Sequence, residues 1–360
     1  MKEFIWAETQ NIFVKGRFYK EMKFRMNVLR RKNLLVLLLI SFSFILYACG
    51  NKENEVKEDM DKSKVTLNSG AIVVGENGTY KNYDIKDGKY SELNGDQTIV
   101  EYNENTNNYI FIKDSKHFVK FNGEDIKIDE VNYDFLNLSE NGEAVAYMVN
   151  DNGYKLKILD LKSKESKFVK EDTQISGNLF DFTGDNKLVY YGIGKDKTNG
   201  IFTYDLKTGE EKLLYKLSGG GYVEFLKGYK DGVIIFQQTL DNNKVLKEIT
   251  KDGEVKVLSE DIEKVKDVIK NNGKYYVLGS FSGDSNSLYE LNTDKTYNRL
   301  VYDFPKGVDL NKGISITKDG LLLFVGVDEY NKPSIYSYDK NGNVNLVLDG
   351  KEDYTFVKIN

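Results

Sequence analysis

The segment "FTGDNKLVYYGIGKDKTNGIFTYDLKTGE", residues 182–210, decides the fold. It holds two short apolar runs, "LVYYG" and "GIFTYDL", separated by a polar loop and flanked by Gly, Asp and Asn. These turn residues accept the positive φ angles of tight connections, so short apolar runs between them are typical of antiparallel hairpins. The segment therefore predicts two neighbouring β-strands.

The same pattern recurs along most of the chain. Apolar runs return every 35 to 46 residues, at 71–75, 109–112, 144–148, 188–192, 233–236, 275–279 and 321–326. An alternating strand precedes each later run, while a second strand and a short outer strand follow it. Each unit thus holds four short strands in about 40 residues, the pattern of a β-propeller blade. We count seven units.

The units resemble the repeat of TolB-like and WD40-like (PD40-type) β-propellers. In that repeat a turn and an apolar strand precede a strand that ends in Asp-Leu-x-Thr-Gly, as residues 182–210 do in full and 316–343 in large part. Asp160, Asp205 and Asp339 match the Asp of the repeat. The resemblance implies an all-β, seven-bladed propeller of four-stranded antiparallel blades over residues 67–360. It implies a fold and not a function.

The first unit lacks an innermost strand, and the end of the chain offers one. The stretch "YTFVKIN" at 354–360 resembles the first strands of other units, and an unpaired sheet edge is a liability. We therefore expect this strand to close the ring in the first blade, with Phe356 and Ile359 against the strand that contains Ile72 and Val74. In the alternative, "KVTLN" at 64–68 is the first strand and the tail is an extra strand or a disordered end.

The N-terminal part is typical of a secretion signal. A basic cluster at 30–32 precedes an uncharged run at 34–48, which is shorter than the roughly 20 residues of a membrane span. "LYAC" at 46–49 resembles the lipobox of bacterial lipoproteins, with Tyr47 larger than usual. This resemblance implies a lipid on Cys49 and removal of residues 1–48. The alternative is a plain membrane anchor with an incidental cysteine.

Three regions follow from this organisation. Residues 1–48 are the signal peptide, with Met22 or Met26 as alternative starts, and residues 49–66 hold the lipidated cysteine and a disordered charged tether. Residues 67–360 form the propeller. We expect a monomer anchored on the outer, extracytoplasmic face of the cell membrane. The richness in Lys, Asn, Ile and Tyr is typical of an AT-rich genome and points to a Gram-positive bacterium.

Charge and composition exclude several functions. Removing residues 1–48 takes away nine basic and three acidic side chains, which leaves 42 basic against 53 acidic and a net charge of −11. That balance does not suit nucleic acid, which needs a basic surface. After Cys49 the chain has one His, one Arg and no Trp or further Cys. A Ser-His-Asp triad would require His117, and a His-based zinc site is excluded.

We therefore expect a non-catalytic module that binds or scaffolds a protein, peptide or glycan, with no cofactor. Calcium in loops such as 150–153 or 282–286 is the one metal left open. The alternative function is a carboxylate-based hydrolase or lyase acting on cell-wall or extracellular polysaccharide. A mainly structural envelope protein is a third interpretation.

Ligand residues are expected on one face of the ring. In propellers, the loops between second and third strands and the links between blades share a face with the channel entrance. The glycine-rich link "SGGGY" at 218–222 lies there, either as a flexible connection or as a loop that exposes its backbone. The candidate ligand-binding residues in these loops are Asp196, Tyr222, Asp241, Asp284 and Tyr330.

Overall fold

The computed structural model describes residues 65–150, 153–169, 172–184 and 186–360. The predicted signal peptide, Cys49 and nearly all of the tether lie outside the described residues. The described part of the chain contains 30 β-strands and no α-helix, so it holds no helix that could span a membrane.

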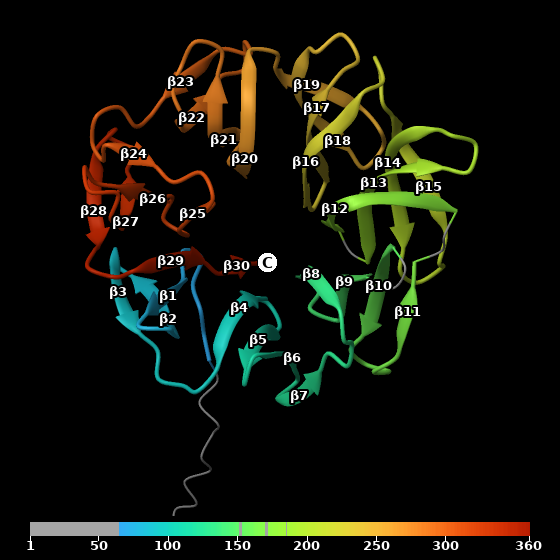
Figure 1. The fold of residues 1–360 in the computed structure, drawn as a ribbon, viewed down its shortest axis with the longest axis horizontal. Helices are drawn as coiled ribbons and strands as arrows, with labels where there is room; N and C mark the ends of the chain where they lie inside the picture. The colour runs from blue at the N-terminus through green and yellow to red at the C-terminus, as the bar shows by residue number, and fades with distance from the viewer. Residues whose placement is uncertain (1–64, 151–152, 170–171, 185) are drawn as a thin grey trace, which may run out of the picture. The chain divides into compact units, whose positions relative to one another are not determined.

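Seven antiparallel sheets are arranged in a ring, with the first strand of each nearest the centre (Figure 1). Blade 1 consists of β29 (Asp353–Phe356), β1 (Ile72–Glu76), β2 (Thr79–Lys86) and β3 (Lys89–Glu92). Blade 2 consists of β4 (Thr98–Tyr102), β5 (Tyr109–Lys113), β6 (Lys116–Phe121) and β7 (Glu124–Lys127), with β30 (Lys358–Ile359) added beside β4. Blade 3 consists of β8 (Tyr133–Leu138), β9 (Ala144–Asn150), β10 (Tyr154–Asp160) and β11 (Ser166–Phe168).

The remaining four sheets continue the ring. Blade 4 consists of β12 (Thr173–Thr183), β13 (Lys187–Gly194), β14 (Asn199–Asp205) and β15 (Glu211–Lys216). Blade 5 consists of β16 (Tyr222–Tyr229), β17 (Gly232–Gln238), β18 (Lys244–Thr250) and β19 (Val255–Ser259). Blade 6 consists of β20 (Ile262–Asn271), β21 (Lys274–Phe281), β22 (Ser287–Leu291) and β23 (Tyr297–Arg299). In blade 7, β24 (Gly307–Val308) and β25 (Ile314–Ile316) both pair with β26 (Leu322–Val327), which β27 (Pro333–Tyr338) and β28 (Val344–Leu348) follow. The predicted seven-bladed propeller is confirmed.

The hydrophobic core is divided among the junctions between blades. Each of the seven clusters of buried apolar residues in the described chain draws its members from two adjacent blades. Between blades 7 and 1, for example, Leu323 and Val325 pack in the same cluster as Ile72 and Tyr354. Both faces of most sheets are therefore covered, which explains the continuous apolar runs of the second strands.

The Asp of the sequence repeat forms the turn after the third strand. Asp160 Oδ1 accepts a hydrogen bond from the backbone N–H of Lys162 at 3.0 Å, and Asp205 Oδ1 accepts one from Lys207 at 2.9 Å. Asp339 Oδ1 does the same with Asn341 at 2.8 Å. A side chain that binds the backbone two residues ahead is an Asx turn, so the repeat Asp specifies a connection in each of these blades.

The C-terminal segment closes the ring, as predicted. Strand β29 pairs antiparallel with β1, and Phe356 lies opposite Ile72. The alternative first strand is wrong, because residues 65–68 are not in a strand. Ile359 departs from the expectation, since it pairs with Tyr102 of β4 in blade 2.

The tail therefore joins two blades instead of one. After β29, Val357 donates its N–H to the Ala71 carbonyl at 2.9 Å, and the chain then crosses to blade 2 as β30, which runs parallel to β4. Asn360 N–H reaches the Tyr102 carbonyl at 2.9 Å, and Glu104 N–H reaches the Asn360 carbonyl at 3.0 Å. The "C" label in Figure 1 accordingly lies at the centre of the ring.

Replacing Tyr354 by Ala should destabilise the domain by about 3 kcal/mol, because it removes a fully buried aromatic ring from the closing strand. Urea unfolding followed by tyrosine fluorescence measures the change. Tyr330→Ala is the matched control, since Tyr330 is 74% exposed, and it should change stability by less than about 0.5 kcal/mol. Equal losses in the two variants would contradict closure by this strand.

Candidate functional site

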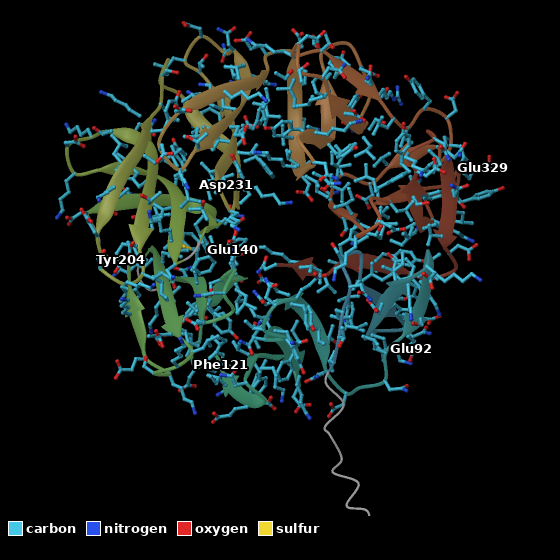
Figure 2. The ribbon with its side chains drawn as sticks, turned by 180° about the vertical axis from the view of Figure 1, so that it is seen from behind. Glu92, Phe121, Glu140, Tyr204, Asp231 and Glu329 are labelled. Atoms are coloured by element: carbon cyan, nitrogen blue, oxygen red, sulfur yellow. The ribbon has the colours of Figure 1, made fainter. Side chains whose placement is uncertain are left out.

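A cavity of about 730 Å³ lies where the inner strands of the blades meet. Every blade contributes to its lining, and the charged residues among its walls are Glu140, Asp181, Lys227, Lys230, Asp267, Lys312 and Lys358. Glu140 and Lys230 lie in turns between the first and second strands of their blades. Figure 2 shows Glu140 and Asp231, the residue that follows Lys230 in sequence, at the inner rim of the ring. The cavity therefore extends toward this end of the strands.

Lys358 of the closing tail lies at the centre of an ionic network in this cavity. Its Nζ lies 3.0 Å from Asp181 Oδ1 in blade 4 and 3.3 Å from Glu101 Oε1 in blade 2. It also donates to Asn137 Oδ1 in blade 3 at 2.8 Å. Asn360 adds a bond from its Nδ2 to Glu101 Oε1 at 2.8 Å. One side chain thus links the tail to three consecutive blades.

Burial and charge shift the pKa values of this network. Burial raises the pKa of Glu101, which is 3% exposed, and this effect exceeds the opposing pull of Lys358 and Asn360. Burial alone would lower the pKa of Lys358, but the charges of Asp181 and Glu101 outweigh it and raise that pKa. Lys358 therefore stays a cation and is the counterion of both carboxylates.

Two aspartates accept hydrogen bonds from backbone N–H groups at the inner edges of the sheets. Asp181 accepts the N–H of Phe182 at 2.9 Å and that of Gly228, in the next blade, at 3.0 Å. Asp267 binds in the same way, and it accepts the N–H groups of Val268 at 2.8 Å and Ile314 at 3.1 Å together with Lys227 Nζ at 2.7 Å. Unpaired edge N–H groups are costly and invite pairing with other chains. Both carboxylates therefore hold adjacent blades together.

Lysines supply the free hydrogen-bonding capacity of the cavity. Lys227 and Lys312 each bind one carboxylate, Asp267 at 2.7 Å and Asp353 at 2.5 Å. An ammonium group carries three N–H donors, so each retains donors for a ligand. Lys230 is exposed at the rim. The lysines of the cavity thus offer hydrogen-bond donors, while its aspartates are already engaged.

The five residues proposed from the sequence lie at the opposite ends of the strands. Asp196, Asp241, Asp284 and Tyr330 occupy turns between second and third strands, and Tyr222 begins β16. None of them lines the cavity. They are also spread over blades 4 to 7, so no single site brings all five together.

Their described contacts are local. Asp196 accepts the N–H of Thr198 at 2.9 Å, and Asp284 pairs with Arg299 Nη1 at 2.9 Å. Tyr222 donates its hydroxyl to Gln238 Oε1 at 3.0 Å. Asp241 and Tyr330 are exposed. These contacts stabilise turns, and whether a ligand binds at this face stays a prediction.

The cavity residues were missed although the sequence carried a signal for them. Asp181, Asp267 and Lys358 each interrupt an apolar first strand, in "LFDF", "KDVIK" and "FVKIN". A charged side chain on an inner strand needs a partner on another blade across the ring axis. A single repeat does not show which residues of the other blades lie opposite it. His117 lies away from the cavity on β6, where its Nδ1 contacts the Tyr133 hydroxyl at 3.1 Å and burial lowers its pKa.

Metal binding has no evident location in the described chain. Among residues 65–360, outside the three short gaps, no three His, Cys, Asp or Glu side chains are close enough together to hold an ion. One of the two loops proposed for calcium, at 150–153, lies partly outside the described residues.

Comparison with known proteins supports the architecture. No protein-family model matches the chain, and no curated protein matches it in sequence. Among solved structures, oligogalacturonate lyase from Vibrio parahaemolyticus is 15% identical with a TM-score of 0.51, over 79% of this chain and 85% of the lyase. Acylaminoacyl peptidase from Pyrococcus horikoshii is 16% identical with a TM-score of 0.54, over 79% of this chain but only 51% of the peptidase.

TolB from Acinetobacter baumannii is also among the similar structures, at 12% identity and a TM-score of 0.45 over 81% of this chain and 79% of TolB. Of these three structures, the two with TM-scores above 0.5 are a lyase and a peptidase, enzymes of different chemistry. Identities this low establish the fold alone. The chain is therefore a seven-bladed β-propeller in its fold.

Replacing Lys358 by Met should lower the free energy of unfolding by about 2 kcal/mol, because it leaves Glu101 and Asp181 without their counterion. Burial then holds the pKa of Glu101 above its unfolded value, so the folded variant binds a proton more tightly and loses stability as pH rises. The deficit relative to the parent should be larger at pH 8 than at pH 5 in urea unfolding.

Lys81→Met serves as the control for this substitution. Lys81 pairs with Glu92 at 2.5 Å, but both side chains are well exposed. Its loss should change the free energy of unfolding far less than the loss of Lys358 does, with little pH dependence, because solvent screens an exposed pair. A Lys358→Met deficit that is equally small, or that grows toward pH 5, would show that Lys358 is not the counterion of the buried carboxylate.

Proposed function

We propose that this protein is a lipid-anchored, extracytoplasmic propeller that binds an acidic segment of a protein partner in its axial cavity without transforming it. One observation carries the non-catalytic part. Asp181 and Asp267, the aspartates of the cavity wall, are engaged by lysines and by backbone N–H groups of adjacent strands. A general acid or base must be free to exchange a proton with substrate, and these groups hold the ring together instead.

The ligand class is inferred from the remaining donors. Lys227, Lys230 and Lys312 present N–H groups to the cavity, so a bound molecule must accept hydrogen bonds and carry negative charge. Ile269, Ile316 and Phe356 add apolar walls beside these cations. A peptide that combines acidic and apolar side chains satisfies both features, whereas a polysaccharide supplies few apolar groups.

Site-specific crosslinking can test this binding mode. A photoreactive benzoylphenylalanine in place of Lys230, at the cavity rim, should capture a partner in intact cells. The same group in place of Lys340, an exposed residue in the turn between the outer strands β27 and β28, is the control away from the cavity. The purified partner should then bind Lys230→Glu about tenfold more weakly than the parent, with strong salt dependence.

The carboxylate-based hydrolase or lyase is tested on the same protein. Incubation with acidic cell-wall or extracellular polysaccharide should release no new reducing or unsaturated ends. Release of such ends by the parent protein, lost in Asp267→Asn while the fold is retained, would replace the binding proposal with the enzymatic one.

The anchor has a separate test. Labelled palmitate should be incorporated into the parent protein and not into Cys49→Ala, and globomycin should block maturation of the parent. Cys49→Ala should also leave the membrane fraction. Membrane association that survives the substitution without lipid incorporation would favour the uncleaved anchor segment.

A further inference from the structure

The link between β15 and β16 contains an unusual backbone conformation. Gly219, Gly220 and Gly221 follow one another with φ angles of 73°, 62° and 80°, all in the left-handed region. A Cβ on Gly221 would come within 1.9 Å of the Gln238 carbonyl oxygen, so this position has no room for a side chain. The "SGGGY" sequence is thus required by one specific turn, here termed the glycine turn (Ser218–Gly221), and is not a generic flexible linker.

The carbonyl groups of the glycine turn are all bound by the protein. The donors are Gln237 Nε2 to Ser218 O at 2.9 Å and to Gly220 O at 2.6 Å, Leu240 N to Gly219 O at 3.2 Å, and Asn199 Nδ2 to Gly221 O at 2.8 Å. Blades 4 and 5 both take part in this anchoring.

The N–H groups of the turn consequently point the other way. In a trans peptide, the C=O of one residue and the N–H of the next are antiparallel. Because the carbonyls of Ser218, Gly219 and Gly220 point into the protein, the N–H groups of Gly219, Gly220 and Gly221 point out of it. Within the described chain no acceptor binds these three N–H groups. Three adjacent donors therefore face outward from one turn.

A buried cation contacts the first residue of the glycine turn. Lys247 is 5% exposed, and its Nζ donates to Gln237 Oε1 at 2.7 Å, Tyr215 hydroxyl at 3.2 Å and Ser218 Oγ at 3.4 Å. All three acceptors are neutral, and no described carboxylate lies within ion-pair distance of this lysine. Lys358 differs, since two carboxylates balance it. A buried charge without a counterion is costly, and an anion at the glycine turn would offset that cost.

The chemistry of Tyr215 agrees with a positive potential at this place. Burial alone would raise the pKa of Tyr215, but the hydrogen bonds from Ser218 and Lys247 outweigh burial and lower it. The phenol oxygen lies 2.8 Å from Ser218 Oγ, at the start of the turn. The surroundings of the turn thus favour negative charge.

We propose that the glycine turn is a binding site for an anionic oxygen group, a phosphate or a carboxylate. The N–H groups of Gly219, Gly220 and Gly221 donate to the anion, the Ser218 hydroxyl borders it, and Lys247 supplies the charge. Successive backbone N–H groups in a turn form such anion-binding concavities. The site lies at the end of the strands away from the axial cavity, so it adds a second recognition point to the propeller.

The test follows glycine amide signals in the full domain. Protein labelled with [15N]glycine and [13C]carbonyl-serine shows only the Gly that follows a Ser in a carbonyl-filtered spectrum, and Ser218→Ala identifies the Gly219 signal by removing it. Inorganic phosphate should shift the Gly219 signal in a saturable way, while sodium chloride at equal ionic strength should not. Parallel titrations with acetate and glycerol phosphate separate carboxylate from phosphate preference.

Two lysine variants decide the role of the buried charge. Lys247→Met should weaken phosphate binding at least about fivefold, since it removes the cation that contacts the turn. Lys216→Met, an exposed lysine on β15, should leave it unchanged. Ser218→Ala, at an exposed position, tests the site in a variant that keeps the fold. Its phosphate binding is followed on the glycine signals of the unfiltered spectrum, and it should be weakened to a smaller extent than in Lys247→Met. The absence of saturable shifts with every anion, or equal shifts with chloride, would overturn the proposal, whereas Lys230→Glu should not affect these signals.

Discussion

The closing strand is the constraint on which the rest of the structure depends. A ring of sheets without it would leave β1 with a bare edge toward the axis and Tyr354 outside the core. Residues 353–360 satisfy this edge and then continue into blade 2, so they supply inner strands to two blades. Lys358 becomes the central cation of the cavity because the tail crosses there. Fold and cavity are therefore consequences of one segment.

The charged groups of the ring axis serve this architecture. In many propellers, acids that converge on a channel invite a catalytic interpretation. Here Asp181 and Asp267 complete the hydrogen bonding of strands that have no neighbour on their inner side. Lysines remain with unused donors, and the proposed preference of the cavity for hydrogen-bond acceptors rests on this asymmetry. Stability and the proposed ligand preference thus depend on the same contacts.

Sequence patterns predicted much of this fold for physical reasons. Alternating apolar residues indicate strands with one buried face, and residues such as Asp205 and Gly209 indicate turns. The blades and their connections could therefore be counted from short sequence patterns. The closing strand could also be predicted from the sequence, because the first unit lacks an inner strand and the C-terminal segment is a strand without a partner. The pairing of Ile359 with blade 2 could not be predicted, because the crossing of the chain from blade 1 to blade 2 depends on the curvature of the ring.

The candidate site was less predictable. Loop composition favoured the face that holds Tyr222 and Asp284, yet the cavity extends toward the other end of the strands. Which end is hollow depends on how side chains from all seven blades fill the axis, and no single repeat contains that information. "SGGGY" was recognisable as special, but Lys247 lies about 30 residues away in sequence, and only the three-dimensional structure brings it into contact with the turn.

The division of the core among blade junctions has a consequence for biogenesis. Each apolar layer needs two blades, so no blade can bury its own faces alone. Synthesis proceeds from the N-terminus, and the closing strand that pairs with β1 comes much later, since Phe356 is 284 residues (356 − 72) after its partner Ile72. Until they appear, β1 and its apolar faces stay open to proteases and to other nascent chains. Such a protein should depend on a holding chaperone during its synthesis, more than a domain of equal size built from local contacts.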